Sequence, residues 1–305
     1  MGHPLFKRHL SLERLEEMSL LIYGTISSIV LALYAAGFSL TYGISGLANF
    51  AHGALYILSG FIAWSFLNQV ELPYYLSALL SIIISGLIGF GIYWGLLLRV
   101  RGIPLAELVV TFAAGVAILE LLMWKGFYGI QYSLPLFLEG GVEIKGVAVD
   151  YQRLFVIGTG VVLVVLLWLF VHHTKIGLAF RGMAQNERTA LSVGIESDWI
   201  GSLSLAFGSA LAGVAAIVIL PMGLMESAIG YEVLIYALAV AIVGGLESTS
   251  GVIVASFILG FGQVATAKFL SAKWMIIVPL VAIIFVLVIR PSGLFGKFKE
   301  LEERI

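Results

Sequence analysis

Residues 45–60 read SGLANFAHGALYILSG and lie within a long stretch of chain that carries no formal charge. From Met18 to Val70 the sequence contains no Asp, Glu, Lys or Arg. A helix needs roughly 20 apolar residues to cross a hydrocarbon core of about 30 Å, so the stretch is long enough for two crossings. Its middle holds Asn49, His52 and Gly53, which are polar or weaken a helix. The stretch predicts two membrane spans that meet at a polar, glycine-rich break.

The composition of the whole chain agrees with a membrane protein. Of the 305 residues, 60% are hydrophobic and 11% are charged, and the mean hydropathy is +1.06. Soluble domains are about 25% charged, and a soluble fold of this size has no means of burying so much apolar surface. The net charge of −1 gives no reason to expect a nucleic acid partner. The absence of cysteine excludes disulfides and thiolate metal sites.

Uncharged runs along the chain predict an all-α, polytopic transmembrane helix bundle with about eight spans and broken or re-entrant glycine-rich segments. A short amphipathic segment, 1–18, precedes the transmembrane domain, 19–290, and a tail, 291–305, follows it. The predicted spans are 19–43, 46–68, 74–98, 105–123, 154–173, 200–220, 233–268 with an internal break, and 274–289.

Orientation is predicted from the positions of lysine and arginine, which favour cytoplasmic loops. They place the loop marked by Arg99 and Arg101, the loop 174–199 and the tail in the cytoplasm, and the loop 125–153 outside. The N-terminus is ambiguous. Basic residues at positions 7, 8 and 14 favour the cytoplasm, whereas three plain crossings before Arg99 put the N-terminus outside.

The loop 174–199 is long for a helix connection and contains its own helical pattern. Apolar residues recur at helical spacing and stop at Gly194, which is a plausible helix end. An amphipathic helix in a charged loop has two explanations of equal weight. It lies on the lipid headgroups, or it is a docking element for a cytoplasmic partner.

A second glycine-rich break follows near the end of the chain. Residues 42–63 and 243–264 both break at glycines and polar residues after an uncharged helix, and the second break contains Gly244, Gly245 and Glu247. Irregular backbone at membrane depth survives only against protein or water, so paired breaks point to a transport pathway. For single residues a structural role is favoured, with glycines allowing close helix contacts, Asn49 capping a helix and His52 bonding to the backbone.

Four motifs carry a resemblance to a known family. The segment GLANFAHGALYILSG resembles the G-x-x-N-F-A-H-G segment of permease subunits from branched-chain amino-acid ABC importers. TKIGLAFRGMAQNERTALSVGI resembles the cytoplasmic loop of that family, ALAVAIVGGLESTSGVIVASFILG its glycine-rich late helix, and VLVIRPSGLFG its usual ending. The late segment of the family usually continues from Gly-Gly with Gly, Ser and Pro, so Glu247 departs from the pattern.

The resemblance implies a transport subunit of the cell membrane, bacterial or archaeal, that is not itself an enzyme and needs no cofactor. It would form the translocation pathway for branched-chain or hydrophobic amino acids, or for related small polar solutes, delivered by a binding protein. Its partners are two cytoplasmic ATP-binding-cassette ATPases, a second permease chain that is a copy or a relative, an extracytoplasmic substrate-binding protein and membrane lipid. The chain has no G-x-x-x-x-G-K-[ST] phosphate loop, which agrees with ATP hydrolysis by partners. The implied pathway residues are Asn49, His52, Gly53, Gly244, Gly245 and Glu247. The implied ATPase-coupling residues are Arg181, Met183, Asn186, Ala190 and Gly194.

Three other classes of protein compete with this interpretation. An ion-coupled secondary carrier needs an ionisable residue deep in a span, for which Glu120 and Glu247 are the candidates. An intramembrane enzyme would have to use His52, Asn49 and nearby serines without an acidic orienting group. A channel would need a selectivity filter of repeated carbonyl or acidic rings, which no segment resembles.

Overall fold

The computed structural model describes residues 4–127 and 132–296. The ends of the predicted N-terminal segment and tail, 1–3 and 297–305, and part of the predicted exterior loop, 128–131, lie outside the described residues. The described chain is a helix bundle with one small sheet, which confirms the predicted fold class. The elements are α1 (Pro4–Ser45), α2 (His52–Asn68), α3 (Tyr74–Gly95), η1 (Leu97–Arg99), α4 (Pro104–Leu122), η2 (Met123–Phe127), β1 (Gly141–Ile144), β2 (Val147–Asp150), α5 (Tyr151–His173), α6 (Lys175–Gln185), α7 (Glu187–Ser192), α8 (Ser197–Ile219), η3 (Leu220–Met222), α9 (Ser227–Gly244), α10 (Thr249–Phe269), η4 (Ala272–Trp274) and α11 (Ile277–Ile289).

Eight helices within the described residues are long and apolar enough to cross a membrane. The number agrees with the predicted one, but the membership differs. The predicted span 233–268 divides into α9 and α10, which are separate spans. The predicted span 46–68 is a six-residue break followed by α2, which has only 17 residues and is not among the eight. The spanning segments are Arg14–Ser45, Tyr74–Arg99, Pro104–Lys125, Tyr151–His173, Ser197–Met222, Ser227–Gly244, Thr249–Phe269 and Ala272–Ile289.

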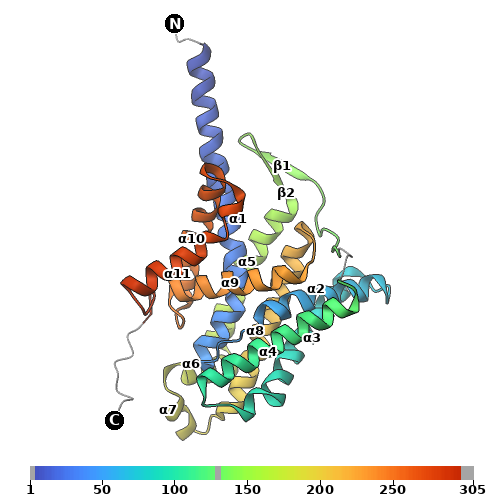
Figure 1. The fold of residues 1–305 in the computed structure, drawn as a ribbon, viewed down its shortest axis with the longest axis vertical. Helices are drawn as coiled ribbons and strands as arrows, with labels where there is room; N and C mark the ends of the chain where they lie inside the picture. Colours follow the sequence, from blue (N-terminus) through green and yellow to red (C-terminus); the bar gives the residue numbers. More distant parts are fainter. Residues whose placement is uncertain (1–3, 128–131, 297–305) are drawn as a thin grey trace.

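Helix α1 runs lengthwise through the molecule (Figure 1). Its 42 residues correspond to about 63 Å. We call the end that carries Gly141–Asp150 the hairpin end and the end that carries Lys175–Ser192 the loop end. The chain begins at the hairpin end, where the Tyr23 hydroxyl donates a hydrogen bond to the Ala148 carbonyl oxygen at 2.7 Å. The start of α1 therefore lies at the opposite end of the molecule from the loop 174–199, contrary to the side that its basic residues favour.

The hairpin within the predicted exterior loop was not anticipated. Strands β1 and β2 pair antiparallel, with Gly141 opposite Asp150 and Ile144 opposite Val147. The two connecting residues, Lys145 and Gly146, both have positive φ angles, 51° and 86°, as a tight two-residue hairpin turn requires. Gly146 packs against Leu15 of α1, so the hairpin braces the projecting part of that helix.

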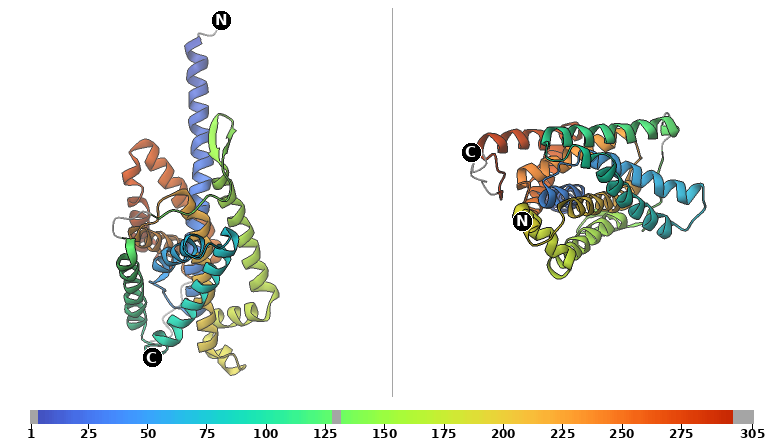
Figure 2. Two further views of the ribbon diagram at one scale, coloured as in Figure 1. Left: turned by 90° about the vertical axis from the view of Figure 1, so that its right-hand side faces the viewer. Right: turned by 90° about the horizontal axis from the view of Figure 1, so that it is seen from below.

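Two sets of four helices, α1–α4 and α8–α11, repeat one arrangement; we call them the first half and the second half. Helix α1 packs along α10 as α8 packs along α3, α2 packs on α8 as α9 packs on α1, and α4 and α11 flank α2 and α9 respectively. The counterparts α1 and α8 run antiparallel, because the Ser204 hydroxyl near the start of α8 donates to the Ser45 hydroxyl at the end of α1 at 3.1 Å. The halves are therefore an inverted repeat about an axis in the membrane plane. Seen along α1, that helix and α8 lie side by side in the middle (Figure 2).

Reciprocal glycine contacts mark where the halves cross. A Cβ atom added to Gly208 would lie 2.7 Å from the carbonyl oxygen of Gly37, and one added to Gly37 would overlap that of Gly208. Gly53 and Gly230 are related in the same way across α2 and α9. The expected repeat of 42–63 in 243–264 is therefore wrong, because the spatial counterpart of the α1–α2 break is the α8–α9 connection.

Burial is uneven among the helices. In α8, 72% of the spanning segment is buried inside the chain, against 17% for α5 and 11% for α11. The exposed side chains of α5 are almost all apolar, as lipid contact requires. Helix α8 is thus the core helix, while α5 and α11 form the periphery.

Candidate functional site

The break between α1 and α2, residues 46–51, is held by side chains. Gly46 has a φ of +68° and ends α1. The hydroxyl of Thr111 on α4 accepts from the Phe50 N–H and lies 3.2 Å from the Ala48 carbonyl oxygen. The Asn49 side-chain oxygen accepts the Ala51 N–H at 3.1 Å, a local turn of the kind that starts helices. The side chains of Thr111 and Asn49 thus pair backbone groups of the break at Ala48, Phe50 and Ala51.

His52 is the first residue of α2 and links it to α1. Its Nε2 donates a hydrogen bond to the Tyr34 carbonyl oxygen at 2.8 Å, and its ring meets Phe38 edge-on. Only 1% of its surface is exposed. The buried His52 Nδ1 and Asn49 Nδ2 make no hydrogen bond within the described part of the chain. Such unpaired buried groups are uncommon in folded proteins and are concentrated at functional places.

The other predicted pathway residues lie in two different places. Gly53 is at the crossing with Gly230, close to His52. Gly244 and Gly245 end α9 near the loop end, where the C-terminal segment folds back on them. The N–H groups of Leu294 and Phe295 donate to the carbonyls of Val243 and Gly244, at 2.9 and 3.0 Å.

Close backbone contacts account for this group of glycines. A Cβ atom on Gly244 would overlap Gly251, and one on Gly245, whose φ is +104°, would overlap Gly296. The glycines at the end of α9, at the start of α10 and in the C-terminal segment therefore pack together, and we call this contact the α9–α10 joint. Glu247 follows in the same connection, and its backbone lies near Gly43 of α1. Leu246 of the α9–α10 joint and Ala48 and Phe50 of the α1–α2 break pack against the same buried cluster, which includes Phe38 and Leu234.

The predicted coupling residues form two short helices at the loop end. Thr174 caps α6 by accepting the Gly177 N–H at 2.9 Å, and Asn186 caps α7 by accepting the Thr189 N–H at 2.9 Å. Gly194, with a φ of +85°, follows the end of α7. The sequence therefore placed this helical loop correctly but did not show that Asn186 divides it.

The apolar stripe of the loop faces inward. Met183 and Ala190 are 5% and 3% exposed and pack with Phe180 and Ile200 on the end of the bundle. They anchor α6 and α7, and Arg181 lies half-buried on α6. The outward face of α7 and of the turn after it consists of exposed side chains. They are Arg188, Leu191, Ser192 and Val193.

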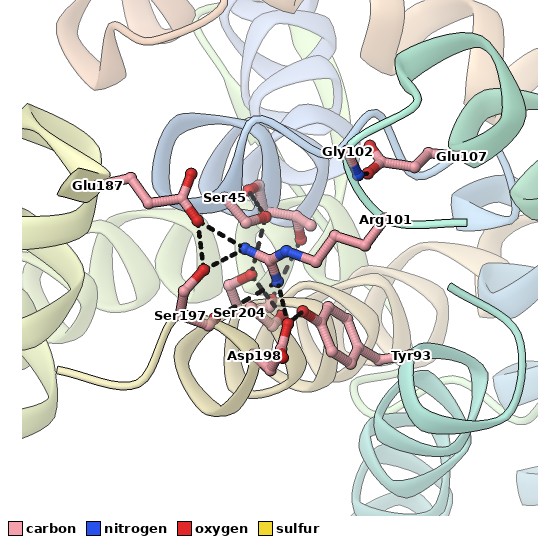
Figure 3. A network of polar contacts seen from close by, with 11 residues as sticks. Ser45, Tyr93, Arg101, Gly102, Glu107, Glu187, Ser197, Asp198 and Ser204 are labelled. Carbon is pink, nitrogen blue, oxygen red and sulfur yellow. Dashed lines mark hydrogen bonds and ion pairs between the residues drawn. The ribbon is translucent and has the colours of Figure 1, made fainter. Parts of the chain in front are cut away.

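An arginine that the sequence indicated only as an orientation signal ties this loop to the bundle (Figure 3). Arg101, between α3 and α4, forms ion pairs with Glu187 of α7 at 3.0 Å and with Asp198 of α8 at 3.1 Å. It also donates to the Ser197 hydroxyl. The Tyr93 hydroxyl of α3 donates to Asp198 at 2.9 Å, and its ring lies under the guanidinium. We call Tyr93, Arg101, Glu187, Ser197 and Asp198 the Arg101 network.

The Arg101 network contributes more to the position of α7 than to the free energy of folding. The two carboxylates are about half exposed, and pairs of that kind contribute about 0–1 kcal/mol each. One guanidinium nevertheless links α7 to α8, to α3 and to the α3–α4 connection. No sequence signal identified it, because its partners Glu187 and Ser197 are 86 and 96 residues away. Among the described residues no group of three His, Asp or Glu side chains is placed to hold a metal ion.

Comparison with known proteins gives consistent matches. The family model described as branched-chain amino acid transport system / permease component matches residues 20–287. The chain is 27% identical to the high-affinity branched-chain amino acid transport system permease protein BraD of Pseudomonas aeruginosa, over 91% of this chain and 95% of that protein. It is 26% identical to the probable branched-chain amino acid transport permease protein LivH of Methanocaldococcus jannaschii, over 94% and 95%.

A solved structure supports the fold alone. The structure titled PsaBC from Streptococcus pneumoniae in complex with Fab aligns with a TM-score of 0.51 at 14% identity, over 94% of this chain and 98% of that chain. The family match, by contrast, spans nearly the whole bundle from α1 to α11. The protein therefore belongs to the family of permease components of branched-chain amino acid transport systems, and it is a multi-pass protein of the cell membrane.

Proposed function

We propose that this chain is one of two membrane subunits of an ATP-driven importer for branched-chain and similar apolar amino acids. The names of its relatives supply the substrate class. Two cytoplasmic ATPases bind at the loop end, and an extracytoplasmic binding protein delivers the solute at the hairpin end. The observation that carries the proposal is the α6–α7 unit, which faces outward on one side and is fixed to the bundle on the other.

The outward face of α7 is suited to a protein partner. Leu191 and Val193 are 50% and 72% exposed, and Arg188 lies beside them. Apolar side chains next to an arginine are typical of the centres of protein interfaces. The predicted contacts Arg181, Met183, Asn186, Ala190 and Gly194 then serve mainly to hold this face in position.

The Arg101 network provides a route from the docking face to the membrane helices. A partner that displaces α7 also displaces Glu187, and through Arg101 the displacement reaches α3, α4 and α8. Because α8 is the core helix that joins both halves, its movement changes the bundle as a whole. ATP binding and release shift the bundle only if the ATPases bind its two states with different affinities.

The pathway is proposed to pass the break at Asn49, His52 and Gly53, where the unpaired buried nitrogens of Asn49 and His52 mark a polar place at membrane depth. Gly244, Gly245 and Glu247 lie toward the loop end, where they would line the inner mouth. The face of each subunit that does not contact its partner is covered by lipid.

The test is purification of the chain from its native membrane with a mild detergent. The proposal predicts recovery of one or two proteins that contain phosphate loops and of a second permease chain. Leu191→Glu together with Val193→Glu should release the ATPases while the permease chains stay together. Leu138→Glu, an exposed leucine at the hairpin end, is the matched control and should release nothing.

Ala190→Glu is a poor test because it would place a carboxylate in the packed anchor of α7. If the doubly substituted chain keeps its ATPases at the wild-type ratio, the docking face is elsewhere. If the wild-type chain is recovered alone and transports without ATP, the importer proposal is wrong.

A further inference from the structure

Glu232 is the only Asp, Glu, Lys or Arg in α9, a spanning helix. Its side chain is exposed, whereas the opposite side of the helix, including Val233 and Ala237, is buried. Ala228, one turn earlier, is exposed on the same face, and Tyr236, one turn later, is half-buried. We call Ala228, Glu232 and Tyr236 the α9 stripe.

The α9 stripe lies at membrane depth. Tyr236 stacks on Tyr34 of α1, with ring centroids 6.2 Å apart and planes 8° apart, and Glu232 lies one turn before Tyr236 on the same helix. Along the axis of α1, Tyr34 lies eleven residues, or about 17 Å, before the end of the helix at Ser45. It lies twenty residues, or about 30 Å, after Arg14. The carboxylate is therefore not at the rim of the bundle.

The neighbourhood of Glu232 is polar, with contributions from four helices. The Ser27 hydroxyl of α1 donates to the Gln263 side-chain oxygen of α10 at 3.2 Å. The ring of Tyr34 meets that of Tyr56 of α2 edge-on, with centroids 5.5 Å apart. Tyr34 and Tyr56 are buried inside the chain, whereas the side chain of Glu232 is exposed. No ion pair within the described residues involves Glu232.

An exposed carboxylate at this depth has no stable place against lipid. On insertion scales an acidic residue at the centre of a spanning helix costs about 2.5–3.5 kcal/mol, and such residues face bundle interiors or water. Helix α5 shows what lipid-facing positions of this chain look like, since its exposed residues include Val161, Val165 and Leu169. The α9 stripe differs from these positions because Glu232 and Tyr236 carry polar groups.

We propose that the α9 stripe lines the water-filled solute pathway, and that Glu232 interacts there with the positively charged amino group of the passing solute. This inference rests on the proposed function and narrows its substrate class. Solutes would need an ammonium group next to an apolar body. Acids of the same shape without the amino group would be disfavoured by the negative charge.

The absence of cysteine makes a direct accessibility test possible. Ala228→Cys is built with Glu232 intact and with Glu232→Gln, in the complete importer in proteoliposomes, and labelling of this chain is read by its mass. The probes are a cationic and an anionic water-soluble methanethiosulfonate. Ala228→Cys should react, with the cationic reagent preferred at least threefold, and Glu232→Gln should remove that preference. Val165→Cys, on the lipid side of α5, should stay unlabelled.

A transport measurement follows with labelled leucine and with 4-methylpentanoate, which has the same carbon skeleton without the amino group. Glu232→Gln should lower leucine uptake at least tenfold and reduce the discrimination between the two solutes. Glu226→Gln, at the residue before α9, is the matched control and should leave both unchanged.

Two results would overturn the inference: labelling of Ala228→Cys no faster than that of Val165→Cys, or leucine uptake unaffected by Glu232→Gln. Failure of the proposed function looks different, because the wild-type importer would then show no ATP-driven uptake. The labelling comparison does not depend on uptake and would still decide whether the α9 stripe meets water.

Discussion

The two inverted halves are tied to each other at both ends, but by contacts of unequal strength. At the loop end Arg101 of the first half pairs with Asp198 of the second, within a network of five residues. At the hairpin end Lys268 of the second half pairs with Glu16 of the first, at 3.2 Å. The basic residue belongs to the first half at the loop end and to the second half at the hairpin end, as an inverted repeat requires. Only at the loop end does it pair with two carboxylates. The repeat therefore supplies the scaffold, and the loop end is reinforced where the proposed ATPases act.

The breaks of the two halves are also supported differently. Thr111 and Asn49, both in the first half, pair the backbone of the α1–α2 break. In the α8–α9 connection the Met225 N–H instead donates to the Tyr132 carbonyl oxygen at 2.8 Å, in a loop outside both halves. One break is built into its own half, and the other depends on the loop before the hairpin.

The helices after the breaks differ in exposure. With Gly53 opposite Gly230, Leu55 of α2 corresponds to Glu232 of α9. Leu55 is fully buried, whereas Glu232 is exposed. Helix α2 is thus a packing element and α9 presents a polar face, although both occupy the same place in their halves.

The largest effect is expected where the halves cross. Gly53→Val would push a branched side chain into the backbone of Gly230. Overpacking of this kind costs about 3 kcal/mol or more when backbone has to move, so the chain should fail to fold. Gly91→Val is the matched control, since nothing lies near the Cβ position of Gly91 in α3. Yield and thermal unfolding in detergent measure the difference between the two variants. Equal stability would show that the Gly53–Gly230 contact does not limit the size of the side chain there.

The unequal ion pairs make the next prediction. Arg101→Ala should lower ATP-driven uptake about tenfold with the ATPases still bound, because a coupling free energy of 1–3 kcal/mol is typical between linked sites. Lys268→Ala should change uptake less than twofold, since Lys268 takes part in a single ion pair, with the exposed Glu16. The ratio of solute transported to ATP hydrolysed is the measurement. Similar losses in both variants would show that the loop end has no special role.

The support of the first break is tested by Thr111→Val, which keeps the shape of the side chain. The Phe50 N–H would lose its acceptor in a fully buried site, at a cost of about 1–3 kcal/mol. Thr111→Ser keeps the hydroxyl and should cost much less. The difference in unfolding temperature between the two variants reports the hydroxyl itself, and no difference would mean that water replaces it.

The smallest effect is expected at His52. His52→Leu removes the Nε2 donor to Tyr34 but also the unpaired Nδ1, so the net loss should be about 1 kcal/mol. His52→Gln keeps a donor and should fall between the wild type and His52→Leu. Thermal unfolding in detergent measures this series, and a large loss of uptake without a loss of stability would give His52 a direct role in transport.

Most of the fold was predictable, because spans follow from uncharged runs of sufficient length. The errors arose where the signal is not local. Glycines and polar residues occur at every joint, so their likeness between 42–63 and 243–264 did not identify the true counterparts. That pairing depends on which helices run antiparallel in space, as Gly37 with Gly208 shows.

The candidate site was predictable in part for a similar reason. Helical spacing located Met183 and Ala190 on one face, but it did not say whether that face met the bundle or a partner. Arg101 was visible only as a positive charge, since an ion pair across 86 residues has no periodicity. The exposure of Glu232 follows from the packing of α9 against five other helices and has no counterpart in its local sequence.

The glycine crossings also constrain how such a chain can evolve. At Gly37 and Gly208, and again at Gly53 and Gly230, each residue occupies the space that a side chain on its partner would need. A larger residue in one half is therefore accepted only if the helices separate, which the partner glycine alone does not permit. Among related chains these positions should stay small in pairs, one from each half. The two halves tolerate different residues at other corresponding positions, such as Leu55 and Glu232. At the two glycine crossings we expect the residues of both halves to remain small.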